Sequence, residues 1–159
     1  MEHEAKLDAD SSLGTELTDE EAGTLASLME MRRLADGDYL TEEGVTDDSL
    51  HVLLSGKLEV VKLAGAGETA MLGILRDGQL AGELSFIDGA PPTVGLRALC
   101  DSQVFSLKRE AFEGLVAEHP TIVYKVMRAI VRSAHKTLSR MNYEFIELSN
   151  YIFKQHGRY

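Results

Sequence analysis

The run from Gly82 to Thr93 contains residue types that together suit a phosphate carried on a sugar. Gly82 has no side chain, so a ligand can approach its backbone closely. The amides of Leu84 and Ser85 would begin a short helix, whose positive end favours a negative charge. Glu83 can accept hydrogen bonds from a ribose hydroxyl, and Thr93 can donate one to a phosphate. We therefore expect these residues to form a ligand-binding site.

Short strands must position this run, because glycines divide the middle of the chain into brief apolar segments, among them residues 51–54, 58–63 and 69–75. The glycines that punctuate these segments are Gly37, Gly44, Gly56, Gly73, Gly78 and Gly82. This spacing predicts many short antiparallel strands in a sandwich or barrel. Ahead of them, Thr18 and Glu21 have the spacing of a capping box, which predicts a short helix.

A helical period replaces the strand pattern after Lys108. Residues 110–118 form a short amphipathic segment that ends at His119, because a residue before proline disfavours helical geometry. From about residue 121 to 153, apolar residues recur at alternating steps of four and three, which is a heptad seam. The seam consists of Met127, Val131, Ala134, Leu138, Met141, Phe145, Leu148 and Ile152. Such a helix is about 50 Å long, more than this domain can cover, so we expect a parallel homodimer through the seam.

Charge is distributed unevenly along the chain. Of the 26 acidic residues, 15 lie within residues 1–50, and the net charge is -10. The long helix carries a basic stripe of Lys125, Arg128, Arg132, Lys136 and Arg140. We interpret residues 1–16 as an acidic, flexible leader, with docking to a basic partner as the alternative, and the stripe as a solvated helix face. The acidic total argues against direct DNA binding, which needs a basic surface.

The length and composition favour a single domain in the cytoplasm. The 159 residues can bury one core but are too few for two ordinary domains. Cys100 is the one cysteine, so no intrachain disulfide can form. The sequence has neither a cleavable apolar leader nor a run long enough to cross a membrane.

Several motifs in order resemble the cyclic nucleotide-binding domain family. They are Asp36-Gly37-Asp38, Glu43-Gly44, the segment 53–60 and the segment 78–84, within a resemblance that covers about residues 17–141. The resemblance implies an α+β fold: an eight-stranded antiparallel β-roll of the jelly-roll type, with short flanking helices and a long C-terminal dimerisation helix. The corresponding divisions are a leader (1–16), the β-roll domain (17–120), and the helix with its tail (121–159).

The resemblance also implies a phosphate-binding cassette, but one of its residues differs. The family has an arginine nine positions after the glutamate, where this chain has Pro92, which offers neither charge nor a donor. Arg97 lies five residues further on, and this odd offset turns it to the opposite face of a strand unless a bulge intervenes. Thr137 falls near the place where the family's last helix touches the purine, although it also fits an ordinary heptad flank. We therefore expect cyclic AMP and cyclic GMP to bind weakly or not at all. Glu83 then serves either ribose recognition or neighbouring backbone amides.

Enzymatic activity is not expected from these residues. The five histidines lack metal-ligand spacing, and no serine lies in a nucleophile elbow. The leading hypothesis is a stand-alone regulatory sensor that is dimeric and relays its ligand state through the C-terminal helix to a regulatory protein partner. The alternative is a degenerate scaffold of the same fold that serves dimerisation or docking without a ligand.

Overall fold

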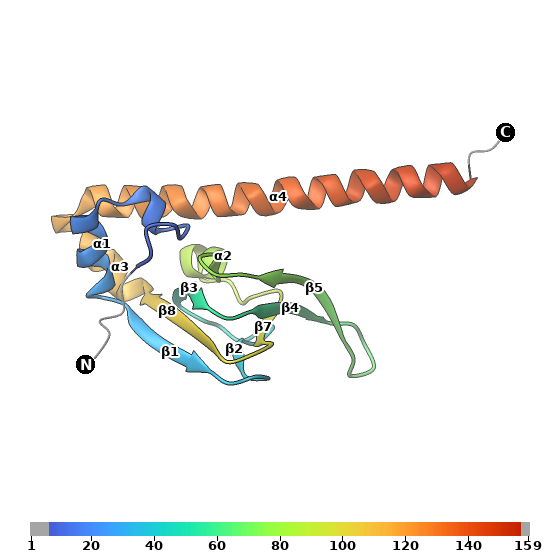
Figure 1. Cartoon of the computed structure of the whole chain (residues 1–159), viewed down its shortest axis with the longest axis horizontal. Helices are drawn as coiled ribbons and strands as arrows, with labels where there is room; N and C mark the ends of the chain where they lie inside the picture. The colour runs from blue at the N-terminus through green and yellow to red at the C-terminus, as the bar shows by residue number, and fades with distance from the viewer. Residues whose placement is uncertain (1–6, 157–159) are drawn as a thin grey trace.

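Eight antiparallel strands in two four-stranded sheets form the centre of the chain, which confirms the predicted β-roll (Figure 1). The computed structural model describes residues 7–156. In spatial order, the first sheet consists of β1 (Glu30–Leu34), β8 (Ser102–Lys108), β3 (Ser49–Ser55) and β6 (Leu80–Ala81). The second consists of β2 (Tyr39–Thr41), β7 (Gly95–Ala98), β4 (Leu58–Leu63) and β5 (Thr69–Leu75). Within the described residues, only β4 and β5 are neighbours both in sequence and in a sheet, as expected for a wound jelly-roll path.

Helices flank the sheets at both ends of the chain and at the cassette. They are the 3₁₀ turn η1 (Gly14–Glu16), α1 (Asp19–Ala26), α2 (Glu83–Asp88), α3 (Arg109–Glu118) and α4 (Pro120–His156). The predicted capping box starts α1: the Glu21 amide donates to the Thr18 hydroxyl at 3.2 Å, and the Thr18 amide donates to the Glu21 carboxylate at 2.9 Å. Helix α4 extends three residues beyond the expected end at residue 153, and the remaining tail lies outside the described residues.

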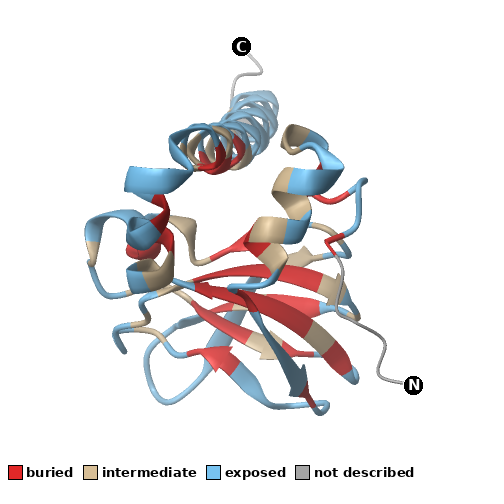
Figure 2. Ribbon diagram, turned by 90° about the vertical axis from the view of Figure 1, so that its left-hand side faces the viewer, coloured by how far each residue is buried: buried red, intermediate tan, exposed pale blue. Residues whose placement is uncertain are grey.

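The apolar core lies in two layers, because successive strand residues face opposite sides of a sheet. Leu50, Val52, Phe105 and Leu107 on β3 and β8 pack towards the helices. Their neighbours Leu53 and Val104 point into the roll, where Leu58, Leu96 and Ala98 meet them from the second sheet. Figure 2 shows buried residues on the strands and on the side of α4 that faces them. The first half of α4 is therefore part of the domain core.

The N-terminal segment is folded against the domain from Leu7 onward, unlike the flexible leader that its composition suggested. Leu7 and Leu13 are buried in the same cluster as the first half of α4. The Ser12 amide donates to the Gly78 carbonyl at 2.9 Å, which ties the segment to the turn before β6. Residues 1–6 of the expected leader lie outside the described residues.

Acidic residues of this N-terminal region pair with the first part of the basic stripe on α4. The Glu16 carboxylate lies 2.6 Å from Arg132 Nη1 and 3.4 Å from Arg128 Nε. Glu21 Oε1 lies 2.5 Å from Lys125 Nζ. The stripe is therefore not simply a solvated face at these positions. The uneven charge along the chain is partly neutralised within the fold.

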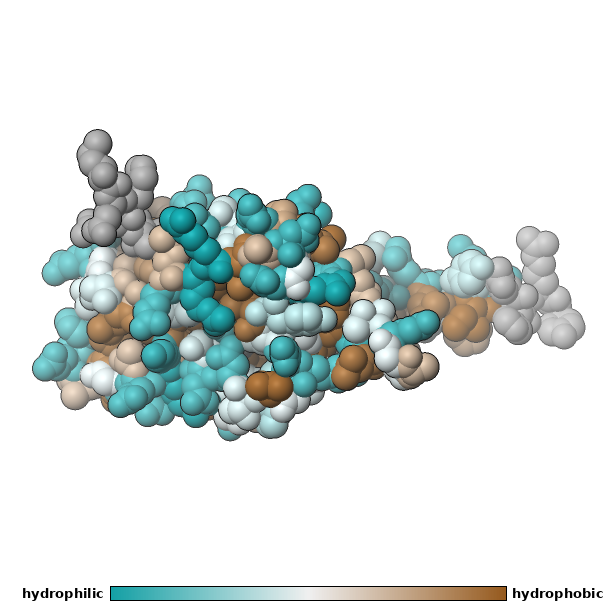
Figure 3. Space-filling view, turned by 90° about the horizontal axis from the view of Figure 1, so that it is seen from below, coloured by the Kyte–Doolittle hydropathy of each residue, from teal (hydrophilic) through white to brown (hydrophobic). Residues whose placement is uncertain are grey.

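The second half of α4 projects beyond the β-roll and exposes its apolar side chains to solvent (Figure 1). Leu138 is 57% exposed and Phe145 is 69% exposed. Figure 3 shows apolar atoms gathered on this projecting part of the helix. These exposed apolar side chains lie on a helix that also carries charged side chains, so this part of α4 is amphipathic. No helix in residues 7–156 combines the length and apolar character needed to cross a bilayer.

Truncating Leu13 tests whether the N-terminal segment contributes to the core. We expect Leu13→Ala to lower the free energy of unfolding by about 2–5 kcal/mol, the usual range for a buried leucine. Urea unfolding followed by circular dichroism measures this change. The matched control is Asp10→Ala, at an exposed position of the same segment, which should change stability by less than about 0.5 kcal/mol. An unaltered unfolding midpoint for Leu13→Ala would contradict the packing described above.

Candidate functional site

The cassette begins at a turn that only glycine fits well. Gly82 precedes α2 with φ of 74°, in the left-handed region. A Cβ atom at this position would lie 3.2 Å from the Ser49 carbonyl oxygen and 3.4 Å from His51 Cδ2. The turn therefore brings α2 close against the start of β3. This close approach defines one wall of the site.

Arg109 closes the other end of α2, although no motif in the sequence marks this residue. Its Nε donates to the Phe86 carbonyl at 2.8 Å, and its Nη2 donates to the Ser85 carbonyl at 3.0 Å. The same guanidinium lies 3.3 Å from Asp48 Oδ1 in the loop before β3. A cation at the C-terminal end of a helix interacts favourably with its last carbonyls. Arg109 thus joins the cassette helix to the loop that forms the opposite wall.

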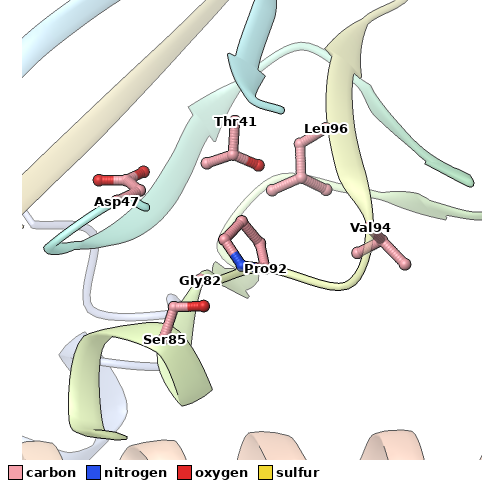
Figure 4. A pocket seen from close by; sticks show the side chains of 7 residues that line it. All are labelled: Thr41, Asp47, Gly82, Ser85, Pro92, Val94 and Leu96. Atoms are coloured by element: carbon pink, nitrogen blue, oxygen red, sulfur yellow. The ribbon is translucent and has the colours of Figure 1, made fainter. Parts of the chain in front are cut away.

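A small cavity lies between this loop, α2 and β7 (Figure 4). Its volume is about 50 Å³. The side chains and backbone that line it belong to Thr41, Asp47, Gly82, Ser85, Pro92, Val94 and Leu96. Pockets for small organic ligands usually measure about 300–1,000 Å³. The cavity as it stands is too small for a nucleotide, and its lining includes the proline found in place of the family arginine.

Asp47 introduces a negative charge into the cavity lining. Its Oδ2 accepts from His51 Nε2 at 2.7 Å, and its Oδ1 accepts from the Ser49 amide at 3.0 Å. Burial alone would raise the pKa of Asp47, but the hydrogen bond and charge of His51, helped by the Ser49 amide, hold that pKa below its usual range. The carboxylate is therefore ionised at neutral pH. Sequence patterns gave no signal for it, because Asp47 lies in an irregular loop.

His51 continues this polar network into the interior of the roll. The ring is fully buried, and its Nδ1 lies 2.7 Å from the Ser106 hydroxyl on the neighbouring strand β8. Because an ionised carboxylate can only accept, Nε2 donates to Asp47, so a neutral ring accepts at Nδ1 from Ser106. Both ring nitrogens are thus satisfied within the protein. Among residues 7–156, no group of three or more histidine, cysteine, aspartate or glutamate side chains is arranged to hold a metal ion.

Arg97 does not replace the missing arginine in this cavity. Its Nε donates to Glu59 Oε1 at 2.6 Å, and the guanidinium carbon lies 5.9 Å from the centre of the Tyr39 ring. Its strand neighbours Leu96 and Ala98 point into the roll, so Arg97 lies on the outer face of the second sheet. The Glu59 carboxylate further raises the pKa of Arg97, which therefore stays charged.

Glu83 faces the long helix instead of the cavity. The Ser133 hydroxyl of α4 donates to Glu83 Oε1 at 3.3 Å, and Glu83 is not among the residues that line the cavity. Burial raises the pKa of Glu83, although the nearby backbone amide of Glu83 itself and the Ser133 hydroxyl counteract part of this rise. The side chain thus connects the cassette to α4 in this structure.

The remaining predicted residues are not brought together at the cavity. Leu84 is 66% exposed, and Thr93 is exposed with its carbonyl accepting from Lys62 Nζ at 3.0 Å. Thr137 lies exposed on α4, beyond the part of the helix that packs on the core. Of the six residues proposed for ligand binding, Gly82 and Ser85 line the cavity. Asp47 and Pro92 also line it, so the lining contains a carboxylate and no cationic side chain.

Comparison with known sequences finds relatives for most of the chain. The family model described as "Cyclic nucleotide-binding domain" matches residues 31–119. A "CRP-like cAMP-activated global transcriptional regulator" of Mycobacterium tuberculosis is 28% identical over 101 residues, which are 64% of this chain and 45% of that protein. "Lysophospholipase NTE1" of Lodderomyces elongisporus is 30% identical over 135 residues, which are 80% of this chain but 9% of that protein. The chain thus spans less than half the length of each of these relatives.

Comparison with solved structures finds the same fold. A cyclic nucleotide-binding domain from Methylobacillus flagellatus aligns with a TM-score of 0.76 at 26% identity, over 84% of this chain and 74% of that one. The N-terminal domain of a transcriptional regulator from Streptomyces coelicolor aligns with a TM-score of 0.70 at 30% identity, over 83% and 92%. The fold of the catabolite activator protein of Thermus thermophilus is also similar, with a TM-score of 0.71.

Replacing Glu83 by glutamine tests the unfavourable burial of its charge. When folding raises the pKa of a carboxyl group, the protonated group favours the folded state. This contribution to the free energy of unfolding is complete below the unfolded pKa and is lost as the pH rises through the folded pKa. Glu83→Gln keeps an acceptor for Ser133 without the charge, so we expect a higher melting temperature at pH 7, by about 2–4 °C for each 1 kcal/mol gained. The gain should vanish in acid, where Glu83 is protonated.

Thermal unfolding at several pH values measures the effect of Glu83→Gln. The matched control is Glu113→Gln on the exposed face of α3, which removes the same charge without changing a buried contact. A lower melting temperature for Glu83→Gln than for the natural chain at pH 7 would contradict the expectation.

Proposed function

The chain belongs to the cyclic nucleotide-binding domain family, and from this membership we propose that it is a dimeric regulatory module whose cassette holds no cyclic nucleotide. The observation that carries the proposal is that Pro92 and Asp47 line the same small cavity. The site has lost a cation and contains a carboxylate near the position where an anionic phosphate would lie. This favours the scaffold alternative over the ligand relay that the sequence alone suggested.

Electrostatics argue against a cyclic phosphate in this cavity. A charge-assisted hydrogen bond from an arginine is worth about 1.5–3 kcal/mol, and this chain lacks that arginine. The ionised Asp47 carboxylate would repel the phosphate at short range and in a partly buried setting, where screening by water is weak. His51 offsets part of this charge only when it is protonated. A bound phosphate would therefore find no cationic side chain among the residues that line this cavity.

The sugar contact is also missing from the present geometry. Glu83 would have to leave Ser133 and turn towards the cavity to accept from a ribose hydroxyl. The cavity would also have to enlarge several-fold to accommodate a base and a sugar. The reorientation of Glu83 and the enlargement of the cavity would each make the free energy of nucleotide binding less favourable, in addition to the electrostatic effect.

The exposed second half of α4 supports pairing with a second copy. Its heptad seam contains large apolar side chains that are more than half exposed, among them Leu138, Met141 and Phe145. Each such side chain gains about 1.5–3 kcal/mol when it becomes fully buried. In a parallel pair the seams of two α4 helices bury each other. We propose that the module acts through this helix on a regulatory protein partner and has no enzymatic activity of its own.

Calorimetric titration with cyclic AMP and cyclic GMP tests the ligand part of the proposal. We expect no saturable heat from the natural chain at millimolar nucleotide. Restoring the cation and removing the carboxylate charge in Pro92→Arg with Asp47→Asn should increase affinity, by about 10-fold to 100-fold for the arginine contact. Asp47→Asn alone serves as the control for loss of the carboxylate. Submicromolar binding by the natural chain would refute this reading of the site.

Sedimentation at micromolar concentration tests the pairing of α4. The natural chain should sediment as a dimer. Leu138→Glu with Phe145→Glu should give a folded monomer, because pairing of the helices would bury unpaired charges in the seam. The matched control is Ser139→Glu with Asn150→Glu, which adds the same charge to the helix outside the seam. A natural chain that sediments as a monomer would exclude the proposed dimer.

A further inference from the structure

A second hollow, larger than the cassette cavity, lies on the outer face of the second sheet. Its volume is about 220 Å³, against about 50 Å³ for the cavity at Pro92. The lining residues are Tyr39, Glu42, Glu43, Val61, Leu63, Thr69 and Gly95. Strand alternation separates the two sites, because Val61 and Leu63 point outward while Leu58 and Val60 pack inside the roll. The outer hollow is therefore independent of the cassette.

The floor and wall of the hollow are held in fixed positions. Val61 is buried, and a Cβ atom on Gly95 would lie 3.1 Å from its Cγ2, so the floor is closely packed. Tyr39, which is 40% exposed, forms the aromatic wall. The Arg97 guanidinium lies 5.9 Å from the centre of this ring, and Glu59 in turn holds Arg97. These contacts restrain the ring without covering the hollow.

The rim of the hollow is acidic. Glu43 Oε2 accepts from the Leu63 amide at 2.9 Å, and Glu43 Oε1 accepts from Lys62 Nζ at 2.9 Å. The backbone amide first, and then Lys62, lower the pKa of Glu43, so this carboxylate is ionised and held in place. Glu42 is exposed and has no ion-pair partner among residues 7–156. Lys62 pairs with Glu43, and Arg97 pairs with Glu59. The charge of Glu42 is therefore not balanced by either of these nearby cations.

We propose that this hollow receives a lysine or arginine side chain from a partner protein. The aliphatic stem of such a residue would lie on Val61 and Leu63, and its cation would lie between the rim carboxylates and the Tyr39 ring. Long basic side chains bury their stems on apolar surface while their charge stays at the edge. A cation over the face of a tyrosine ring is attracted by the negative charge of that face. The acidic rim excludes phosphates, and a purely apolar side chain would leave Glu42 without a counter-charge.

Nuclear magnetic resonance titration of the full chain with three capped pentapeptides tests this proposal. The peptides are Gly-Gly-Arg-Gly-Gly and the versions with Leu or Glu at the centre. We expect the arginine peptide to shift the amide signals of the residues lining the hollow, with a dissociation constant near 1 mM, which corresponds to about −4 kcal/mol. The leucine peptide should bind more weakly, and the glutamate peptide should not bind.

Variants at the rim and wall assign the effect to this site. Glu42→Gln should weaken the arginine peptide by about threefold, the range for an exposed ion pair. Tyr39→Leu should weaken it by a similar factor through loss of the ring. The matched control, Glu68→Gln, removes a charge from the nearby hairpin turn outside the hollow. It should leave the affinity for the arginine peptide equal to that of the natural chain.

Three results would overturn the proposal. The first is the absence of signal shifts at the hollow with the arginine peptide. The second is equal binding of all three peptides. The third is a change of sedimentation in Glu42→Lys, which would make this face an interface between copies of the chain. The first two outcomes do not bear on nucleotide binding or on pairing through α4.

Discussion

The guanidinium of Arg109 holds together the two segments that form the cassette cavity. It binds two carbonyls at the end of α2 and the Asp48 carboxylate in the loop before β3. The cavity residues Ser85 and Asp47 come from these same two segments. Because a single planar cation connects three acceptors, α2 and the loop are fixed relative to each other. This arrangement places Ser85 and Asp47 in the same cavity lining.

The long helix divides into two parts with different surroundings. Ile122, Val126 and Ile130 in its first half are buried in the domain core, while Glu16 and Glu21 bind its basic stripe from the side. The second half has no such cover from residues 7–156 and presents an apolar seam. The core thus fixes the direction of the helix, and the seam remains available to a second molecule. The first half of the helix thus contributes to folding, while the second half is the part through which we propose assembly.

The sequence predicted the architecture well because periodicity and turn residues are local signals. Alternating segments between glycines became strands, and the Thr18–Glu21 spacing became a capping box. The site was less predictable, since its determinants are distant in sequence. Asp47 gains its role only through His51 and the fold around it, and Glu83 meets Ser133 fifty residues away. Composition also misled for residues 7–16, because the burial of Leu13 depends on helices at the other end of the chain.

The packing of the N-terminal segment shows that the packed core of this chain extends beyond the region matched by the family model. The family model matches residues 31–119, whereas the aligned solved structures cover more than four-fifths of the chain. Leu7, Leu13 and Leu25 before this region, and Ile122 and Val126 after it, share one buried cluster with the strands. A protein trimmed to residues 31–119 would lose α1 and α4, and with them the apolar side chains that cover its first sheet. A fragment chosen from the family match alone would therefore omit side chains around which this chain builds its core.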